Sequence, residues 1–253
     1  MSEFPPLDLA CPKPSHCTVA VEELTRLAQA GALPAVTFPA DHPWVRVYSV
    51  HDSFSTPNPG YGDTRFAPFT SLDSGQRIPT LYLAESLAAA LLETTFHYIH
   101  EQDDRVVPEM QLHGRLHAHV TPPADLHVVD LRDERLQQLG LIRDNIASSH
   151  PEHYPCTRRV AQAIHTMRGD GGQQPAGIVW HSRQAELAGH NGVNSMVLFA
   201  DRVPHDRGSW KLLVHQHASG ALLEGSARLT LDTLAESLGV TFIQPLPSHM
   251  RER

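Results

Sequence analysis

Hydrophobic positions recur at helical spacing in several segments of the chain. Val21, Leu24, Leu27 and Ala28 fall three and four residues apart, which predicts a helix over residues 20–30. Gly31 follows at the position where a helix C-cap is expected. Similar patterns predict helices over about residues 86–99, 157–168 and 229–239, and a short polar helix around Leu136 and Leu139.

Short apolar runs between these helices have the length and the flanking turn residues of β-strands. They cover residues 44–50, 78–84, 126–131, 176–181, 193–200 and 209–215. Residues 51–77 are rich in Pro, Gly, Asp, Ser and Thr and predict a long loop, a kind of segment that is often functional. Because strands and helices mix without strict βαβ alternation, we expect an α+β fold with antiparallel strand pairing.

A clean alternation of residue types over residues 111–120 predicts one further strand. Small and apolar residues share one face, while His113, His117 and His119 share the other. This places the three histidines on the solvent-facing side and explains them without a ligand. The sequence has neither a His-Glu-x-x-His nor a Cys-x-x-Cys motif, so we expect no metal at this cluster.

The charge of the chain bears on its partners. The formal net charge is −8 and there is no block of lysine or arginine, whereas nucleic-acid binders usually have a basic surplus. We therefore expect no nucleic acid as a partner of this chain alone. The sequence lacks an apolar run of about 18 residues and a signal-peptide pattern, so we expect a cytoplasmic protein without a membrane span.

The sequence contains three cysteines, Cys11, Cys17 and Cys156, an odd count that favours reduced thiols. The segment from Cys11 to Cys17 resembles half of a zinc site. Its spacing matches no common ligand pattern, and no second half is visible in the sequence. We therefore interpret residues 1–18, which carry four prolines, as an extended arm and expect no metal there.

Candidate chemistry lies in polar residues within apolar elements, since the chain has no Gly-x-Ser-x-Gly, Walker or Rossmann motif. Glu93 is the only charged residue of an otherwise apolar predicted helix, where a carboxylate needs a partner. An ion pair with an arginine such as Arg46, in the middle of a predicted strand, would explain it structurally, and a catalytic role would explain it functionally. Arg65, at the end of the glycine-rich loop, is either solvated or a clamp for phosphate.

Taken together in chain order, these segments resemble the RES domain, a family named for its arginine, glutamate and serine. The matching stretches are Trp44-Val-Arg-Val-Tyr48, Gly62-Asp-Thr-Arg-Phe66, Thr80-Leu-Tyr-Leu-Ala-Glu-Ser86, Ala90-Leu-Leu-Glu-Thr94, Gly177-Ile-Val-Trp-His-Ser182 and Asn194-Ser-Met-Val-Leu-Phe199. The resemblance implies an ADP-ribosyltransferase-like mixed β-sheet core with flanking helices over residues 44–202. It leaves residues 1–43 as an N-terminal arm and helix, and residues 203–253 as a C-terminal extension packed on the same domain.

The resemblance also implies a pocket for NAD⁺. By position, Arg46, Glu93 and Ser182 match the family's arginine, glutamate and serine, and Arg65 and Tyr82 match two further pocket positions. The two arginines would hold the pyrophosphate, and Glu93 would stabilise the positive charge that develops on the ribose when nicotinamide leaves. Tyr82 would orient the nicotinamide ring, and Ser182 its amide or the ribose. NAD⁺ is then a substrate, and neither a cofactor nor a metal is implied.

The function that this resemblance implies is NAD⁺ glycohydrolase or phosphorylase activity, with the protein as the toxin of a type II toxin–antitoxin pair. An Xre-type antitoxin would be its partner. Two alternatives stay open: a protein ADP-ribosyltransferase that uses the same pocket, and a non-catalytic interaction protein that retains the fold. The sequence does not distinguish water, phosphate or a protein side chain as the acceptor of ADP-ribose.

Overall fold

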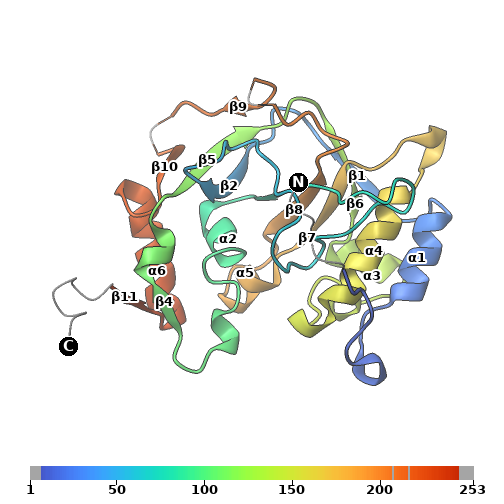
Figure 1. Ribbon diagram of the computed structural model, residues 1–253, viewed down its shortest axis with the longest axis horizontal. Coiled ribbons are helices and arrows are strands. Elements are labelled where there is room, and N and C mark those ends of the chain that lie inside the picture. The colour runs from blue at the N-terminus through green and yellow to red at the C-terminus, as the bar shows by residue number, and fades with distance from the viewer. Residues whose placement is uncertain (1–6, 207, 216, 245–253) are drawn as a thin grey trace.

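A mixed sheet of nine strands forms the centre of the computed structural model, which describes residues 7–206, 208–215 and 217–244 (Figure 1). The strands lie in the order β1-β6-β7-β8-β3-β2-β5-β10, and β9 also pairs with β5. β6 and β7 pair in parallel, and the other neighbours are antiparallel. Their bounds are β1 Ala35–Phe38, β2 Trp44–Ser49, β3 Thr80–Ala84, β5 Arg115–Thr121, β6 Leu126–Asp130, β7 Gly177–His181, β8 Asn194–Phe199, β9 Lys211–Leu212 and β10 Ser219–Ala221.

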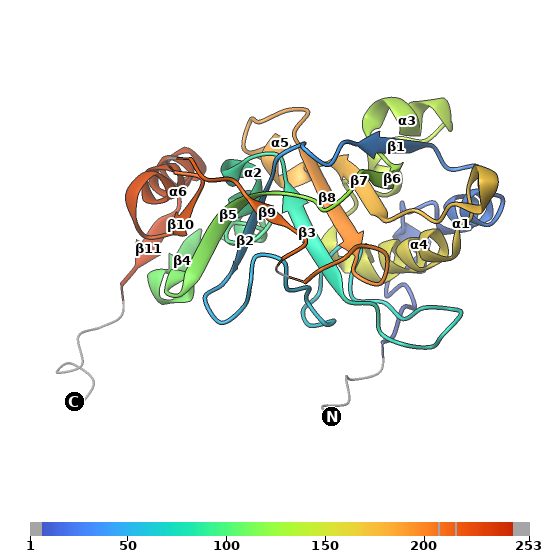
Figure 2. The same cartoon turned by 90° about the horizontal axis from the view of Figure 1, so that it is seen from above.

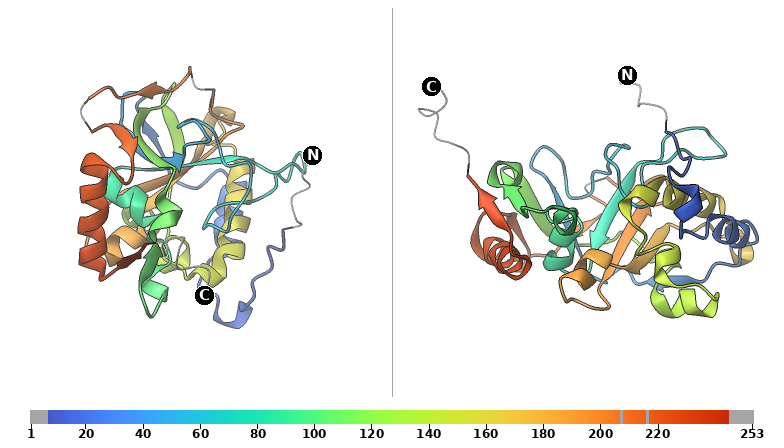
Figure 3. Two further views of the ribbon diagram at one scale, coloured as in Figure 1. Left: turned by 60° about the vertical axis from the view of Figure 1, so that its left-hand side comes forward. Right: turned by 90° about the horizontal axis from the view of Figure 1, so that it is seen from below.

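Helices lie at both ends of this sheet. The helices are α1 Val21–Gln29, α2 Leu87–Leu92, α3 Asp133–Gln138, α4 Tyr154–Thr166, α5 Arg183–Leu187 and α6 Gly225–Leu238. Helices α1, α3 and α4 gather at one end and α6 at the other, beside the parallel pair β4 Val106–Pro108 and β11 Thr241–Ile243 (Figures 2 and 3). The α+β architecture expected from the sequence is therefore confirmed. No helix in the described ranges is both long and apolar enough to cross a membrane.

The N-terminal segment is part of the main core. Helix α1 buries its apolar face against α4, and Gly31 after it adopts the left-handed conformation of a C-cap residue. Strand β1, which the sequence did not predict, pairs with β6 at the edge of the sheet. Helix α1 therefore belongs to the core, and β1 belongs to the sheet.

Most predicted elements form, with changed bounds. Helix α4 begins three residues before its expected start, α6 begins four before, and the strand expected over 209–215 is reduced to β9. The helix expected over 86–99 is α2, which Ser86 caps and which ends at Leu92. Beyond this end the hydroxyl of Thr94 donates to the carbonyl of Ala90 at 2.6 Å, and the backbone N–H groups of Thr94 and Phe96 both donate to the carbonyl of Leu91. Glu93 is therefore the C-cap residue of α2 and does not lie inside a helix.

The histidine strand forms as β5, which begins after the exposed His113; the expectation that the three histidines face solvent was wrong for His117, whose exposure is only 2%. In the β2–β5 ladder His117 lies opposite Val47 and His119 opposite Val45, so these side chains share one face. Val45 and Val47 contact the apolar residues of α2, and Val47 also contacts the cluster that includes α6. The second face is covered because α2 and α6 pack on it, which strand periodicity alone does not reveal.

Candidate functional site

A cavity of about 880 Å³ opens where the central strands β2 and β3 separate. These strands pair only at Val45 and Ala84, whereas β3 pairs with β8 along its whole length. Residues from both strands, from the loop after β2 and from the segment after α2 line the opening. Its volume lies at the upper end of the range for small-molecule sites, roughly 300–1,000 Å³. Arg46, Arg65, Tyr82 and Glu93 all line this cavity.

Arg65 is anchored in the wall of the cavity by backbone and side-chain oxygens. Its Nη1 donates to the carbonyl of Ser149 at 2.9 Å, to the hydroxyl of the same residue at 2.9 Å and to the carbonyl of Ile146 at 3.2 Å. Its guanidinium lies 5.1 Å from the centre of the Tyr154 ring. Burial lowers the pKa of Arg65, and the nearby Glu93 opposes this effect. Within the described part of the chain, Nε and Nη2 have no hydrogen-bond partner and are available to a ligand.

Arg46 is held in a different part of the same cavity. Its Nη1 donates to the carbonyl of Phe54 at 2.6 Å and its Nη2 to that of Thr56 at 2.5 Å, which fixes the start of the long loop. Burial lowers its pKa to about 10, and Asp52 partly opposes the effect of burial. Arg46 makes no ion pair with Glu93, so the structural interpretation of Glu93 as its partner was wrong.

Glu93 and Ser182 meet although 89 positions separate them in the sequence. Ser182 follows β7 and caps α5: its hydroxyl accepts from the backbone N–H of Ala185 at 3.0 Å and donates to Oε1 of Glu93 at 2.5 Å. Burial raises the pKa of the Glu93 carboxyl, while the hydrogen bond from Ser182 and the charge of Arg65 lower it. The arrangement therefore holds one carboxyl in a fixed orientation at the edge of the cavity.

Tyr82 faces the cavity from β3 and closes a small hydrogen-bond network. Its hydroxyl lies 2.7 Å from that of Thr64 and accepts from the backbone N–H of Phe66 at 3.3 Å. Burial raises its pKa to about 12, so the hydroxyl is neutral near pH 7. The ring meets Trp180 edge-on at 6.1 Å between ring centres. The two hydrogen bonds join Tyr82 to the loop that carries Arg65, and the contact with Trp180 joins its ring to β7.

Several residues of the site escaped the sequence analysis. Burial lowers the pKa of His97 to about 4, so its imidazole is neutral, and its Nε2 lies 3.1 Å from the hydroxyl of Tyr154. His97 and Ser195 both line the cavity, and the Nδ1 of His97 and the hydroxyl of Ser195 are buried without a hydrogen-bond partner among the described residues. Ser195 lies in one of the matched stretches, but neither residue carries a motif of its own.

Comparisons with known proteins bear on the fold and on the family of the chain. One chain of the crystal structure of the MbcT–MbcA toxin–antitoxin complex from M. tuberculosis superposes with a TM-score of 0.53 at 17% sequence identity. The match covers 85% of the present chain and 100% of that chain. At this identity the likeness shows a shared fold. The search of curated proteins finds no match.

A family model shows to which protein family the sequence belongs. The model described as the RES domain matches residues 39–214, well over half of the 253-residue chain. The match spans β2, β3, α2, β7 and β8 and therefore all five residues predicted for the site. This chain belongs to the RES domain family.

Proposed function

We propose that this protein cleaves the bond between nicotinamide and ribose in NAD⁺, and that it is the toxin of a toxin–antitoxin pair. The observation that carries the proposal is that Arg65 and Glu93 line one cavity and that the buried Ser182 donates a hydrogen bond to Glu93. A cation with available donors lies there beside a carboxyl that a hydroxyl orients. The family membership and the toxin–antitoxin complex among similar folds support the same conclusion.

The proposed chemistry assigns one task to each group. Departure of nicotinamide leaves positive charge on the ribose, and a carboxylate facing that charge lowers the barrier electrostatically. Glu93 has this role, and Ser182 and Arg65 favour its ionised form against the effect of burial. Nε and Nη2 of Arg65 bind a phosphate oxygen of the dinucleotide. Tyr82 lies beside the ring of the leaving nicotinamide.

Arg46 has a separate task within this proposal. Its electrostatic neighbours are Asp52 and Tyr48, whereas those of Arg65 include Glu93, Tyr154 and Arg183. Arg46 and Arg65 therefore line different parts of one cavity. Within this proposal Arg65 lies at the reacting end of the dinucleotide, and Arg46 lies further along its phosphates or at the second nucleoside.

A toxin that consumes NAD⁺ requires restraint in the cell, and a partner protein that covers the cavity provides it. The toxin–antitoxin complex among similar folds supports such a partner, and an Xre-type antitoxin is the class that we propose. The acceptor of ADP-ribose is water or phosphate within this proposal. Transfer to a protein side chain would use the same pocket and is an outcome that the experiment distinguishes.

The experiment compares the purified full chain with Glu93→Gln, using NAD⁺ labelled in the adenylate half. We expect the wild-type chain to release free ADP-ribose, or its phosphate ester when phosphate is present. Glu93→Gln keeps the shape of the side chain and should lower the rate at least about 100-fold. Label on protein would assign the transferase instead. A folded wild-type chain without turnover would leave the non-catalytic alternative.

A further inference from the structure

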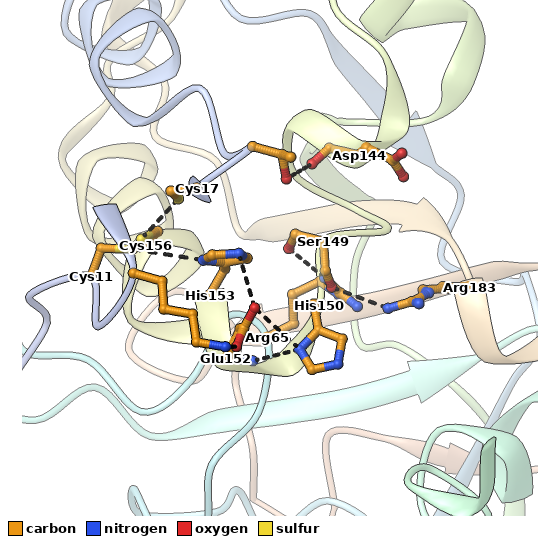
Figure 4. A network of polar contacts seen from close by, with 12 residues as sticks. Cys11, Cys17, Arg65, Asp144, Ser149, His150, Glu152, His153, Cys156 and Arg183 are labelled. Carbon is orange, nitrogen blue, oxygen red and sulfur yellow. Dashed lines mark hydrogen bonds and ion pairs between the residues drawn. The ribbon is translucent and has the colours of Figure 1, made fainter. Parts of the chain in front are cut away.

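A second cluster of reactive side chains lies outside the cavity, at the first turn of α4. Cys11 and Cys17 of the N-terminal arm meet His153 and Cys156, and their ligand atoms all lie within 4.8 Å of one another. Figure 4 shows the four side chains pointing toward one another, two from the arm, one from α4 and one from the turn before it. From this convergence we infer that the protein binds one structural zinc ion with a Cys₃His ligand set.

The distances suit a tetrahedral ion. Zinc binds thiolate sulfur at about 2.3 Å and imidazole nitrogen at about 2.0–2.1 Å, so neighbouring ligand atoms lie roughly 3.5–3.8 Å apart. The Sγ of Cys11 lies 3.6 Å from Nδ1 of His153, and the Sγ of Cys17 lies 3.4 Å from that of Cys156. Small shifts of the side chains would place all four ligand atoms around one metal ion.

Burial and ring orientation add independent support. His153 is 4% exposed and Cys156 is 1% exposed, so half of the ligand set is held rigidly by α4 and the turn before it. Nδ1 of His153 faces the thiols, while its Nε2 lies 3.6 Å from a carboxylate oxygen of Glu152. A carboxylate near the second ring nitrogen is one of the outer partners that zinc-bound histidines use.

The sequence analysis expected no metal here because no second half of a zinc site was visible, and the structure places His153 and Cys156 beside Cys11 and Cys17 as such a half. The sequence shows Cys-x₅-Cys in the arm and His-x₂-Cys at α4, separated by well over a hundred residues. Only folding brings the two halves together. The arm residues Cys11 and Cys17 lie outside the family match, which begins at residue 39, so the site is an addition to the family core.

The ion would fasten the arm to the segment that anchors Arg65. Residues 146–157 contain the zinc ligands His153 and Cys156, and also Ser149, which accepts from Arg65. In the same segment Thr157 donates to the backbone carbonyl of Arg65. A zinc site here therefore stabilises one wall of the cavity without contacting its contents. The inference holds whether or not the proposed activity is correct.

The test measures metal in the untagged full chain, purified under reducing conditions from cells supplied with zinc. We expect about one zinc per chain by mass spectrometry of the element. The double variant Cys11→Ser, Cys17→Ser should retain less than about a tenth of it and unfold at a temperature at least roughly 5 °C lower. His16→Ala is the matched control, because His16 lies exposed between the two cysteines; its zinc content should be unchanged.

Cobalt provides a second readout that does not depend on stability. Replacing zinc by Co²⁺ should give the intense visible bands of a tetrahedral site and a near-ultraviolet thiolate-to-metal band, and both should vanish in the double variant. Two results would overturn the inference. One is a folded wild-type chain that holds less than about 0.2 metal ions per chain with zinc supplied. The other is a native disulfide, such as one between Cys17 and Cys156, detected by intact mass.

Discussion

The hydrogen bond between Ser182 and Glu93 gives a quantitative test of the site. Ser182→Ala removes the hydroxyl that donates to the Glu93 carboxylate at 2.5 Å. A hydrogen bond to a charged group contributes about 1.5–3 kcal/mol, and 1.36 kcal/mol corresponds to one pKa unit. Because this bond lowers the pKa of Glu93 and burial raises it, the pKa in the variant should rise by a further ~1–2 units.

The assay is the pH dependence of kcat/KM for NAD⁺ cleavage. If Glu93 acts as a carboxylate, activity falls on the acidic side as this group becomes protonated. The acidic limb of the profile should therefore move toward higher pH in Ser182→Ala, by the same ~1–2 units. The rate at the high-pH plateau should change much less, because Glu93 is ionised there in both proteins.

Ser182 also caps α5, so the variant loses roughly 1 kcal/mol of unfolding free energy that is unrelated to Glu93. Ser86→Ala is the matched control: Ser86 caps α2 through the N–H of Ala89 in the same way and makes no contact with Glu93. It should lose similar stability and keep the pH profile of the wild type. An unmoved acidic limb in Ser182→Ala, or an equal shift in Ser86→Ala, would refute the reasoning.

Three further predictions concern the same cavity. Arg65→Lys, measured by steady-state kinetics, should raise KM for NAD⁺ at least about 10-fold, since an ammonium cannot replace both the anchoring donors and the available ones. Tyr82→Phe should lower the free energy of unfolding in urea by about 0.5–1.5 kcal/mol through loss of the hydrogen bond to Thr64. The change in activation free energy that corresponds to its kcat should be smaller than this loss. Because burial raises the pKa of Glu93 in the folded chain, this group favours folding at pH values below its unfolded pKa, and that contribution disappears as the pH rises through the folded pKa. Glu93→Gln should therefore unfold in urea at neutral pH with a free energy no lower than that of the wild type.

The hydrophobic pattern predicted the central strands well because they are buried on both faces. Strand β8, for example, is apolar or small along nearly its whole length and lies between β7 and β3. The elements that escaped prediction, such as β1 and β10, are short edge strands whose pairing depends on distant partners. Their residues carry little periodicity of their own, so only the tertiary structure defines them.

The residues of the site also divide into those that the sequence predicted and those that it did not. Glu93 stood out from the sequence because a lone carboxylate in apolar surroundings is costly, and this physical signal is local. Its true partner Ser182 was proposed from the family resemblance alone, because the sequence carries no sign of a contact over 89 positions. His97 was overlooked, and Cys11 and Cys17 were left without His153 and Cys156 as partners, for the same reason: each gains its meaning from residues far away in the chain.

The segment after residue 202 was expected to be an extension packed on the core, and its contacts predict what removing it would do. β9 and β10 pair with β5, and α6 packs against α2. Leu231, Leu234 and Leu238 of α6 are buried, and full burial of one such side chain contributes about 1.5–3 kcal/mol. The three together contribute roughly 5–9 kcal/mol, which is comparable to the whole stability of a typical domain.

A chain truncated after residue 202 should therefore fail to fold. If the residues after 202 acted as a lid over the cavity, the truncated chain would instead remain folded and gain activity. Far-ultraviolet circular dichroism and thermal unfolding of the soluble fraction distinguish these outcomes, with a chain that ends at residue 244 as the control, because it keeps every contact of α6 and β11 that the structure describes. We expect a cooperative transition only in the control. A cooperative transition in the 1–202 chain, with NAD⁺ cleavage above that of the full chain, would show that residues after 202 restrain the site and that their packing is dispensable for the fold.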